Sequence, residues 1–309
     1  MKKIIFFLIL FLFQFNFALA SIKLSKGNIY DGKFSWRGTN FKFPEGEWTY
    51  FNNYYDSINS IDFICIEFVQ TKSNLWKGLF SVCEIVSGGK FAADIGLYLS
   101  NLLKKGKYDN CTLRREYYYA NLWSKGMSYN CFKTRHVDIY KELNYPDDPE
   151  TMVGYISNYV FDNNIKLPKI ALQSQHIISF ASVRDKAIEI VYNVNPELIG
   201  GPKTLYEEES KSEYHRSNIY NYPDAEKFMN EWTKKRAKYH RYFENEMKAK
   251  KSQKLDLSEF GIDIYEIKNL KNEKKDFNII NEIKELNEMY KSGVLTKEEF
   301  EKAKKMLLN

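Results

Sequence analysis

The sequence has few of the residues, and none of the short motifs, on which most enzymes depend. Its 309 residues include four histidines and four cysteines. The signatures G-x-S-x-G, H-E-x-x-H, the P-loop and a correctly flanked G-x-G-x-x-G are absent, so nothing local indicates a hydrolase, a zinc protease or a nucleotide-binding enzyme. No C-x-x-C occurs, and His136 is the only histidine near a cysteine in the sequence. We therefore expect no metal site, no cofactor and no enzymatic activity.

Long apolar runs are also missing, except for one near the N-terminus. The run from Ile4 to Phe13 follows two lysines and precedes an A-x-A cleavage site at 18–20, which together are the three parts of a secretory signal. A membrane-spanning helix needs about 20 apolar residues, whereas Gln14 interrupts this run. We predict export, cleavage near Ala20 and a periplasmic or secreted mature chain. An uncleaved N-terminal anchor is the alternative.

Positive charge is concentrated in one segment. After cleavage the chain would retain 44 Lys and Arg against 40 Asp and Glu, and residues 224–251 alone carry nine against five, which equals the whole excess. A basic helix can bind nucleic acid or an anionic lipid surface, but the KKRAK run at 234–238 is short and has acids nearby. We expect an exposed face of mixed charge and no specific nucleic-acid binding, with a membrane-surface contact as the weaker alternative.

Two β-rich runs around the first two cysteines predict a hairpin. Residues 61–70 and 76–86 are separated by the turn-forming sequence T-K-S-N-L. Folding the chain about residues 73 and 74 places Cys65 opposite residue 82 or 83, within the range that a cross-strand disulfide requires.

Disulfides are expected because an exported chain with four cysteines can pair all of them. The hairpin selects one of the three possible pairings, Cys65 with Cys83, and leaves Cys111 with Cys131. The second bridge would close a loop of about 20 residues and stabilise the fold by roughly 3 kcal/mol.

The pattern of strands and helices predicts an α+β fold. Helices are expected at 90–105, from Asp148 through Val160 and from about Pro223 to Lys250. The expected strands are interrupted by these helices rather than alternating strictly with them, which favours an antiparallel sheet with helices packed on one face. The strand candidates are GKFSWRG, FKFPEGEWTYF, the two hairpin runs, 127–140, 170–183 and 186–194.

One acidic segment keeps a second function open. The string YEEESKSEYHR at 206–216 combines carboxylates, which can do acid and base work, with a histidine; these residues are Glu207, Glu208, Glu209, Glu213 and His215. An exposed charged loop is the simpler interpretation. The alternative is an exported hydrolase or ligand-binding domain, which would require a pocket that joins this loop to His136 or His176. Without such a pocket, His176 is expected to be a core residue. The sequence N-P-E at 195–197 is expected to be a turn.

The region from 35 to 245 resembles a group of exported bacterial proteins with no assigned activity. The resemblance rests on FPEGEW (43–48), the pair Cys111 and Cys131, LP (167–168) before a strand, and YNVNPELIGG (192–201) before a Trp-bearing helix. Tryptophan is expected between 206 and 214, where this chain has tyrosines. The resemblance implies export and no particular reaction.

The C-terminal part differs in character from the rest. Residues 252–276 are polar and charged and predict a linker. Two short apolar faces follow, separated by Gly293, and Thr296 with Glu299 forms a capping box at the start of the second helix. The sequence YKSGVLTKEEFEKAKKMLL resembles the SHOCT domain, the short C-terminal domain of many bacterial proteins.

The SHOCT resemblance implies oligomerisation or docking. Two helices this short are marginal alone in water, so their apolar face needs another surface. A hairpin that folds back on its own chain is the alternative.

We predict a signal peptide at 1–20, an α+β domain at 21–251, a linker at 252–276 and a hairpin at 277–309, and thus a non-enzymatic assembly or docking protein of the periplasm. The expected tail interface is Ile283, Leu286, Tyr290, Leu295, Phe300, Ala303 and Leu307.

Overall fold

The computed structural model divides the chain into two compact units, residues 1–264 and 265–309, which are described separately. It describes residues 24–58, 61–87, 111, 114–125, 128–144, 152–179, 187–248, 255–257, 287, 290–291 and 296–308. The predicted signal peptide, the predicted helix at 90–105 and most of the predicted linker lie outside these residues. Within the described part, no helix is long and apolar enough to cross a membrane.

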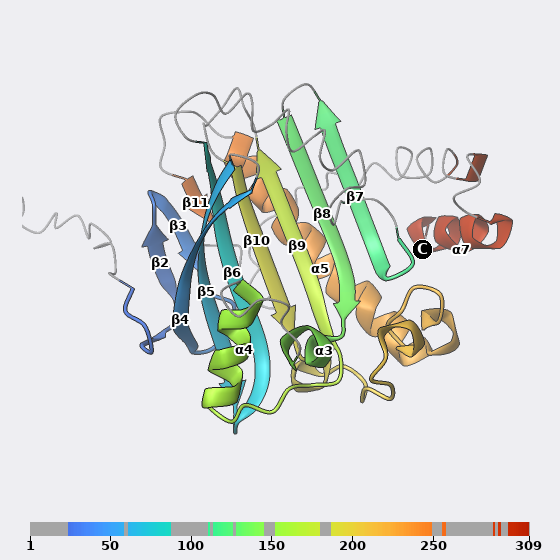
Figure 1. Ribbon diagram of the computed structural model, residues 1–309. Helices are drawn as coiled ribbons and strands as arrows, with labels where there is room; N and C mark the ends of the chain where they lie inside the picture. Colours follow the sequence, from blue (N-terminus) through green and yellow to red (C-terminus); the bar gives the residue numbers. More distant parts are fainter. Residues whose placement is uncertain are drawn as a thin grey trace, which may run out of the picture. The chain divides into compact units, whose positions relative to one another are not determined.

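An eight-stranded antiparallel sheet forms the centre of the first unit (Figure 1). Its order is β1-β4-β5-β6-β10-β9-β8-β7, and most neighbours along the chain are joined as hairpins. The strands are β1 (Ile29–Tyr30), β4 (Trp48–Ile58), β5 (Ile61–Lys72), β6 (Leu75–Ser87), β7 (Tyr117–Lys125), β8 (Ser128–Val137), β9 (Ala171–Ser179) and β10 (Ala187–Val194).

The β5–β6 hairpin turns where the sequence predicts. Ser73 and Asn74 both have positive φ, 51° and 59°, which is the geometry of a tight two-residue hairpin turn. The turn pairs Lys72 with Leu75, and a one-residue shift of register between Gln70 and Thr71 then places Cys65 directly opposite Cys83.

Helices cover the two faces of the sheet unequally. The long helix α5 (Pro223–Lys248) runs behind the sheet in Figure 1, and its Tyr239 and Phe243 pack with Phe68 of β5. The short helices α3 (Ile139–Asn144) and α4 (Met152–Asp162) lie in front, where they share a core with Val69. Side chains alternate between the faces of a strand, so Phe68 and Val69 belong to different layers. The α+β class and the antiparallel sheet are as predicted, and α3 and α4 add a second, smaller layer.

A separate three-stranded sheet, β11-β3-β2, joins the start of the chain to the segment after α5. The strands β2 (Lys33–Trp36) and β3 (Thr39–Lys42) form a hairpin, and β11 (Leu255–Leu257) pairs parallel to β3. Phe34 and Phe43 stack with ring centroids 4.4 Å apart and reach the core shared with α5. Part of the predicted linker is therefore a strand of the first unit.

Two local predictions require correction. Strand β7 was not predicted, because its sequence YYYANLWSK lacks a clear alternation of apolar and polar residues and it lies at the sheet edge, where burial is partial. The strand predicted at 127–140 ends at Val137 instead, since the carboxylate of Asp138 accepts a hydrogen bond from the backbone N–H of Lys141 (2.9 Å) and begins α3.

Candidate functional site

Both disulfides have the predicted partners. Cys65 joins Cys83 across the hairpin with a Cα–Cα distance of 4.0 Å, and Cys111 joins Cys131 with 5.7 Å. All four side chains are buried, so these bridges are structural cross-links rather than reactive thiols.

The glutamates of the 206–216 loop do not converge on one another. Glu207 and Glu208 make exposed ion pairs with Lys169 (3.4 Å) and Lys211 (2.8 Å). Glu213 instead is buried, and its carboxylate accepts a hydrogen bond from the backbone N–H of Leu205 (3.1 Å). The loop therefore uses its carboxylates to hold its own shape.

Two histidines that are far apart in sequence do meet at this loop. The ring of His215 lies edge-on to that of His136 on β8, with centroids 5.4 Å apart, and Nε2 of His136 donates to the backbone carbonyl of Glu209 (3.0 Å). Burial lowers the pKa of His136 to about 4 and, to a lesser degree, that of His215, and burial raises the pKa of the Glu209 carboxyl. The pair fastens the loop to the sheet in its neutral form.

The other two histidines form a second, fully internal pair beneath α5. Nε2 of His240 donates to Oδ1 of Asn130 (2.5 Å), so its Nδ1 is the acceptor for Nδ1–H of His176 at 3.3 Å. Phe132 stacks on both rings. Burial lowers the pKa of His240 to about 3 and that of His176 far below its usual range. His176 is thus a core residue, as predicted, and its partner comes from the helix.

Hydrolytic or metal chemistry receives no support from these pairs. Within the described ranges, no group of three or more His, Cys, Asp or Glu side chains could hold a metal ion. The pocket expected to join His215 and the glutamates to His136 or His176 is not the cleft that the structure presents, which is lined by other residues.

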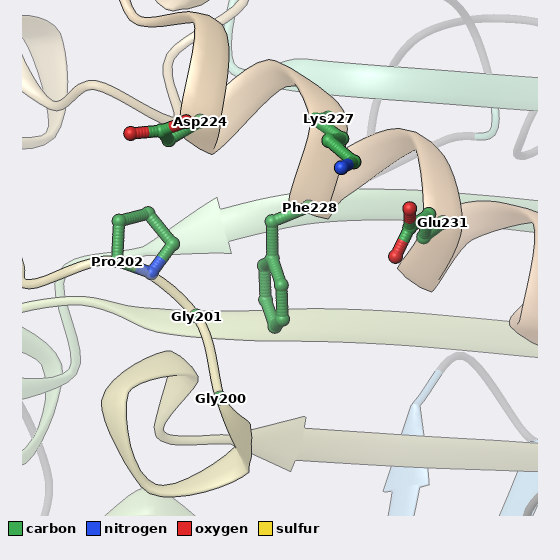
Figure 2. Close-up of a pocket in the computed structure, with 7 residues that line it drawn as sticks. All are labelled: Gly200, Gly201, Pro202, Asp224, Lys227, Phe228 and Glu231. Carbon is green, nitrogen blue, oxygen red and sulfur yellow. The ribbon is translucent and has the colours of Figure 1, made fainter.

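The cleft lies between residues 200–202, here called the strap, and the first turns of α5. It has a volume of about 390 Å³ (Figure 2). The strap supplies backbone and one proline ring, and the helix supplies charged groups around an aromatic ring; the lining residues are Gly200, Gly201, Pro202, Asp224, Lys227, Phe228 and Glu231. The sequence signal that could have located it is the G-G-P run after β10, which was interpreted only as part of a family resemblance.

Local hydrogen bonds hold the strap in place. The chain leaves β10 through a short 3₁₀ helix, Pro196–Ile199, where a turn was predicted, and the side chain of Asn195 caps it by accepting from the N–H of Glu197 (3.1 Å). The N–H of Gly201 donates to the carbonyl of Pro196 (2.8 Å), and the carboxylate of Glu197 accepts from the N–H of Thr204 (2.8 Å). The strap wall is therefore formed before any ligand binds.

Glycine is required at both positions of the strap. Gly200 has φ of 88°, which side-chain-bearing residues rarely adopt. A Cβ on Gly201 would lie 2.9 Å from the ring of Phe228 and 2.8 Å from the carbonyl oxygen of Pro196. Gly201 thus allows the Phe228 ring to approach the strap backbone.

The second unit contains the predicted capping box. The N–H of Thr296 donates to the Glu299 carboxylate (2.9 Å), the N–H of Glu299 donates to Oγ1 of Thr296 (3.3 Å), and helix α7 (Lys297–Leu308) follows. Phe300 is buried and stacks on Tyr290, with centroids 5.2 Å apart. Phe300 belongs to the predicted tail interface; its side chain is buried in this unit, whereas that of Tyr290 is exposed.

The tail is also the part of the chain that matches a known family. The family model of the Short C-terminal domain, SHOCT, matches residues 281–308. No curated protein and no solved structure matches the chain.

Proposed function

We propose that this protein, which carries a C-terminal SHOCT domain, is an exported assembly or docking protein. Its C-terminal hairpin would associate with another protein surface, and the first partner to test is a second copy of the same chain. The observation that carries the proposal is the SHOCT match at 281–308, within a compact unit that begins at Tyr265. The family is associated with oligomerisation, and a pair of helices of this length gains stability by burying its apolar face against a partner.

Two aromatic residues of the predicted tail interface differ in exposure. Phe300 is buried and stacks on Tyr290, whose own side chain is exposed, so changing Phe300 would disturb the packing of the hairpin as well as its surface. Ala303 is half-buried in the following turn of α7. We assign the contact to Tyr290 and Ala303 together with Ile283, Leu286, Leu295 and Leu307 of the predicted apolar stripe.

Export is the second part of the proposal. Two buried disulfides support an oxidising compartment, and the N-terminal sequence supports secretion into it. In that compartment the hairpin would make the contact between molecules, and the sheet domain would remain outside that contact.

Removing the tail tests the assembly role. A chain that ends after Ile264 keeps β11 and the whole first unit, so it should retain a cooperative thermal transition and lose mass in light scattering. Leu286→Ser in the full chain should have the same effect, because a polar residue in the contact forfeits about 1.5–3 kcal/mol of apolar burial. Glu298→Gln, an exposed change on α7, is the matched control and should leave the mass unchanged.

The opposite pattern would overturn the assembly role. If full-length and shortened chains are both monomers, and shortening lowers the melting temperature by many degrees, the hairpin stabilises its own chain instead.

A further inference from the structure

We propose that the cleft between the strap and α5 binds a guanidinium group, as carried by arginine either free or within a peptide. The cleft volume, about 390 Å³, lies in the range of small-molecule sites. Its walls are formed in advance, as described above, so binding would not require the strap to become ordered. The inference is independent of the tail.

The aromatic ring of the cleft favours a planar cation. Phe228 extends from α5 toward the strap in Figure 2, and its ring is half-buried. A guanidinium group stacks on an aromatic ring and is more weakly hydrated than an ammonium, so it loses less on entering such a site.

The charges around the ring favour a cation as well. Asp224 and Glu231 lie two turns apart on α5, about 10 Å along the helix axis, and both side chains are exposed. The charged side chains that line the cleft are thus these two carboxylates and the single ammonium of Lys227, which leaves an excess of negative charge. A guanidinium that stacks on Phe228 could donate two parallel hydrogen bonds to a carboxylate at the rim, which an ammonium cannot do.

Removing Lys227 should have opposite effects on the binding of a cation and of an anion. Lys227 lies between the two carboxylates in sequence and projects from the helix turn that carries Phe228 (Figure 2). It repels a bound cation, so its removal should strengthen guanidinium binding. If the site instead bound a carboxylate, removal of Lys227 would weaken binding.

The test is a calorimetric or NMR titration of the full chain with three probes. These are free arginine, the blocked tripeptide acetyl-Gly-Arg-Gly-amide, and the same tripeptide with citrulline, which keeps the shape of arginine without its charge. Binding by arginine or its tripeptide, and not by the citrulline tripeptide, is expected. The two arginine probes distinguish a free amino acid from a peptide ligand.

Variants locate the binding in the cleft. Glu231→Gln and Phe228→Leu should each weaken binding about 5-fold, corresponding to about 1 kcal/mol, and Lys227→Ala should strengthen it about 2- to 5-fold. Lys238→Ala, an exposed change on α5 outside the cleft, should have no effect. Melting curves for each variant confirm that it folds.

Three results would overturn the inference. They are equal binding of the citrulline tripeptide, weaker binding by Lys227→Ala, and no binding by either arginine probe at about 10 mM. The chain that ends after Ile264 should bind as the full chain does, so failure of the assembly role and failure of this site are distinguishable.

Discussion

At the scale of single residues, one unfavourable group is a carboxyl inside the sheet. Glu67 of β5 is fully buried, and neither of its oxygens accepts a hydrogen bond of good geometry from the described residues. Burial raises the pKa of Glu67 to about 8, and the side chain of Asn52, opposite it on β4, lowers the pKa to a smaller degree. At neutral pH the folded protein therefore keeps this carboxyl protonated, whereas the unfolded chain ionises it.

Glu67→Gln should stabilise the protein at neutral and alkaline pH. Glutamine has nearly the same shape and no proton to lose, so the variant should gain about 2–4 kcal/mol in the free energy of unfolding at pH 7.5. Urea unfolding at pH 7.5 and at pH 4.5 measures this gain, which should vanish at the lower pH. A loss of stability at both values would show that the carboxyl is held by an interaction that glutamine cannot make.

At the scale of elements, the short strand β11 decides where the first unit ends. It pairs with β3 over Leu255–Leu257, beyond the predicted domain boundary at residue 251. Without β11, the backbone N–H and C=O groups on the outer edge of β3 would be exposed to water, and the small sheet would have two strands, which are marginally stable.

Two chain ends, one before β11 and one after it, test the contribution of this strand. A chain that ends after Lys254 should melt about 5 °C lower than one that ends after Ile264, because two or three backbone hydrogen bonds of about 1 kcal/mol each are lost. Differential scanning calorimetry gives both midpoints. Identical midpoints would mean that β11 adds nothing to the stability of the domain.

At the scale of the whole molecule, buried ionisable groups of opposite type set the pH of greatest stability. The pKa of Glu67 is raised in the fold to about 8. Below about pH 4.5 this residue therefore does not lower the free energy of unfolding, and that free energy falls as the pH rises toward 8. The pKa values of His136 and His240 are lowered to about 4 and about 3, so their contribution is complete above about pH 6.5 and is lost as the pH falls.

The free energy of unfolding should therefore be greatest near pH 6.5. Below this value the histidines dominate, because at least two of them act against one glutamate. Above it, Glu67 alone should lower stability by about 1.4 kcal/mol per pH unit up to pH 8. Denaturant unfolding across pH 4–9 measures the profile, and Glu67→Gln should remove the alkaline decline while keeping the acid one. An alkaline decline that persists in the variant would assign it to another group.

The sequence by itself determined the features that depend on neighbouring residues. Ser73 and Asn74 define a tight turn, which places Cys65 opposite residue 82 or 83, and a one-residue shift of register between Gln70 and Thr71 selects Cys83. Thr296 and Glu299 cap α7 through hydrogen bonds that span three residues. These interactions can be predicted from the sequence because both partners lie within one turn or one hairpin.

Only the tertiary structure decided which distant residues meet. His136 lies beside His215, and His176 beside His240, because β8, β9, α5 and the 206–216 loop are brought together by the core of the first unit. Phe228 meets Gly201 for the same reason, and the cleft exists only where they meet. The local sequence around each of these residues carries no record of its partner, since long-range contacts follow from how the apolar faces of all the elements are buried at once.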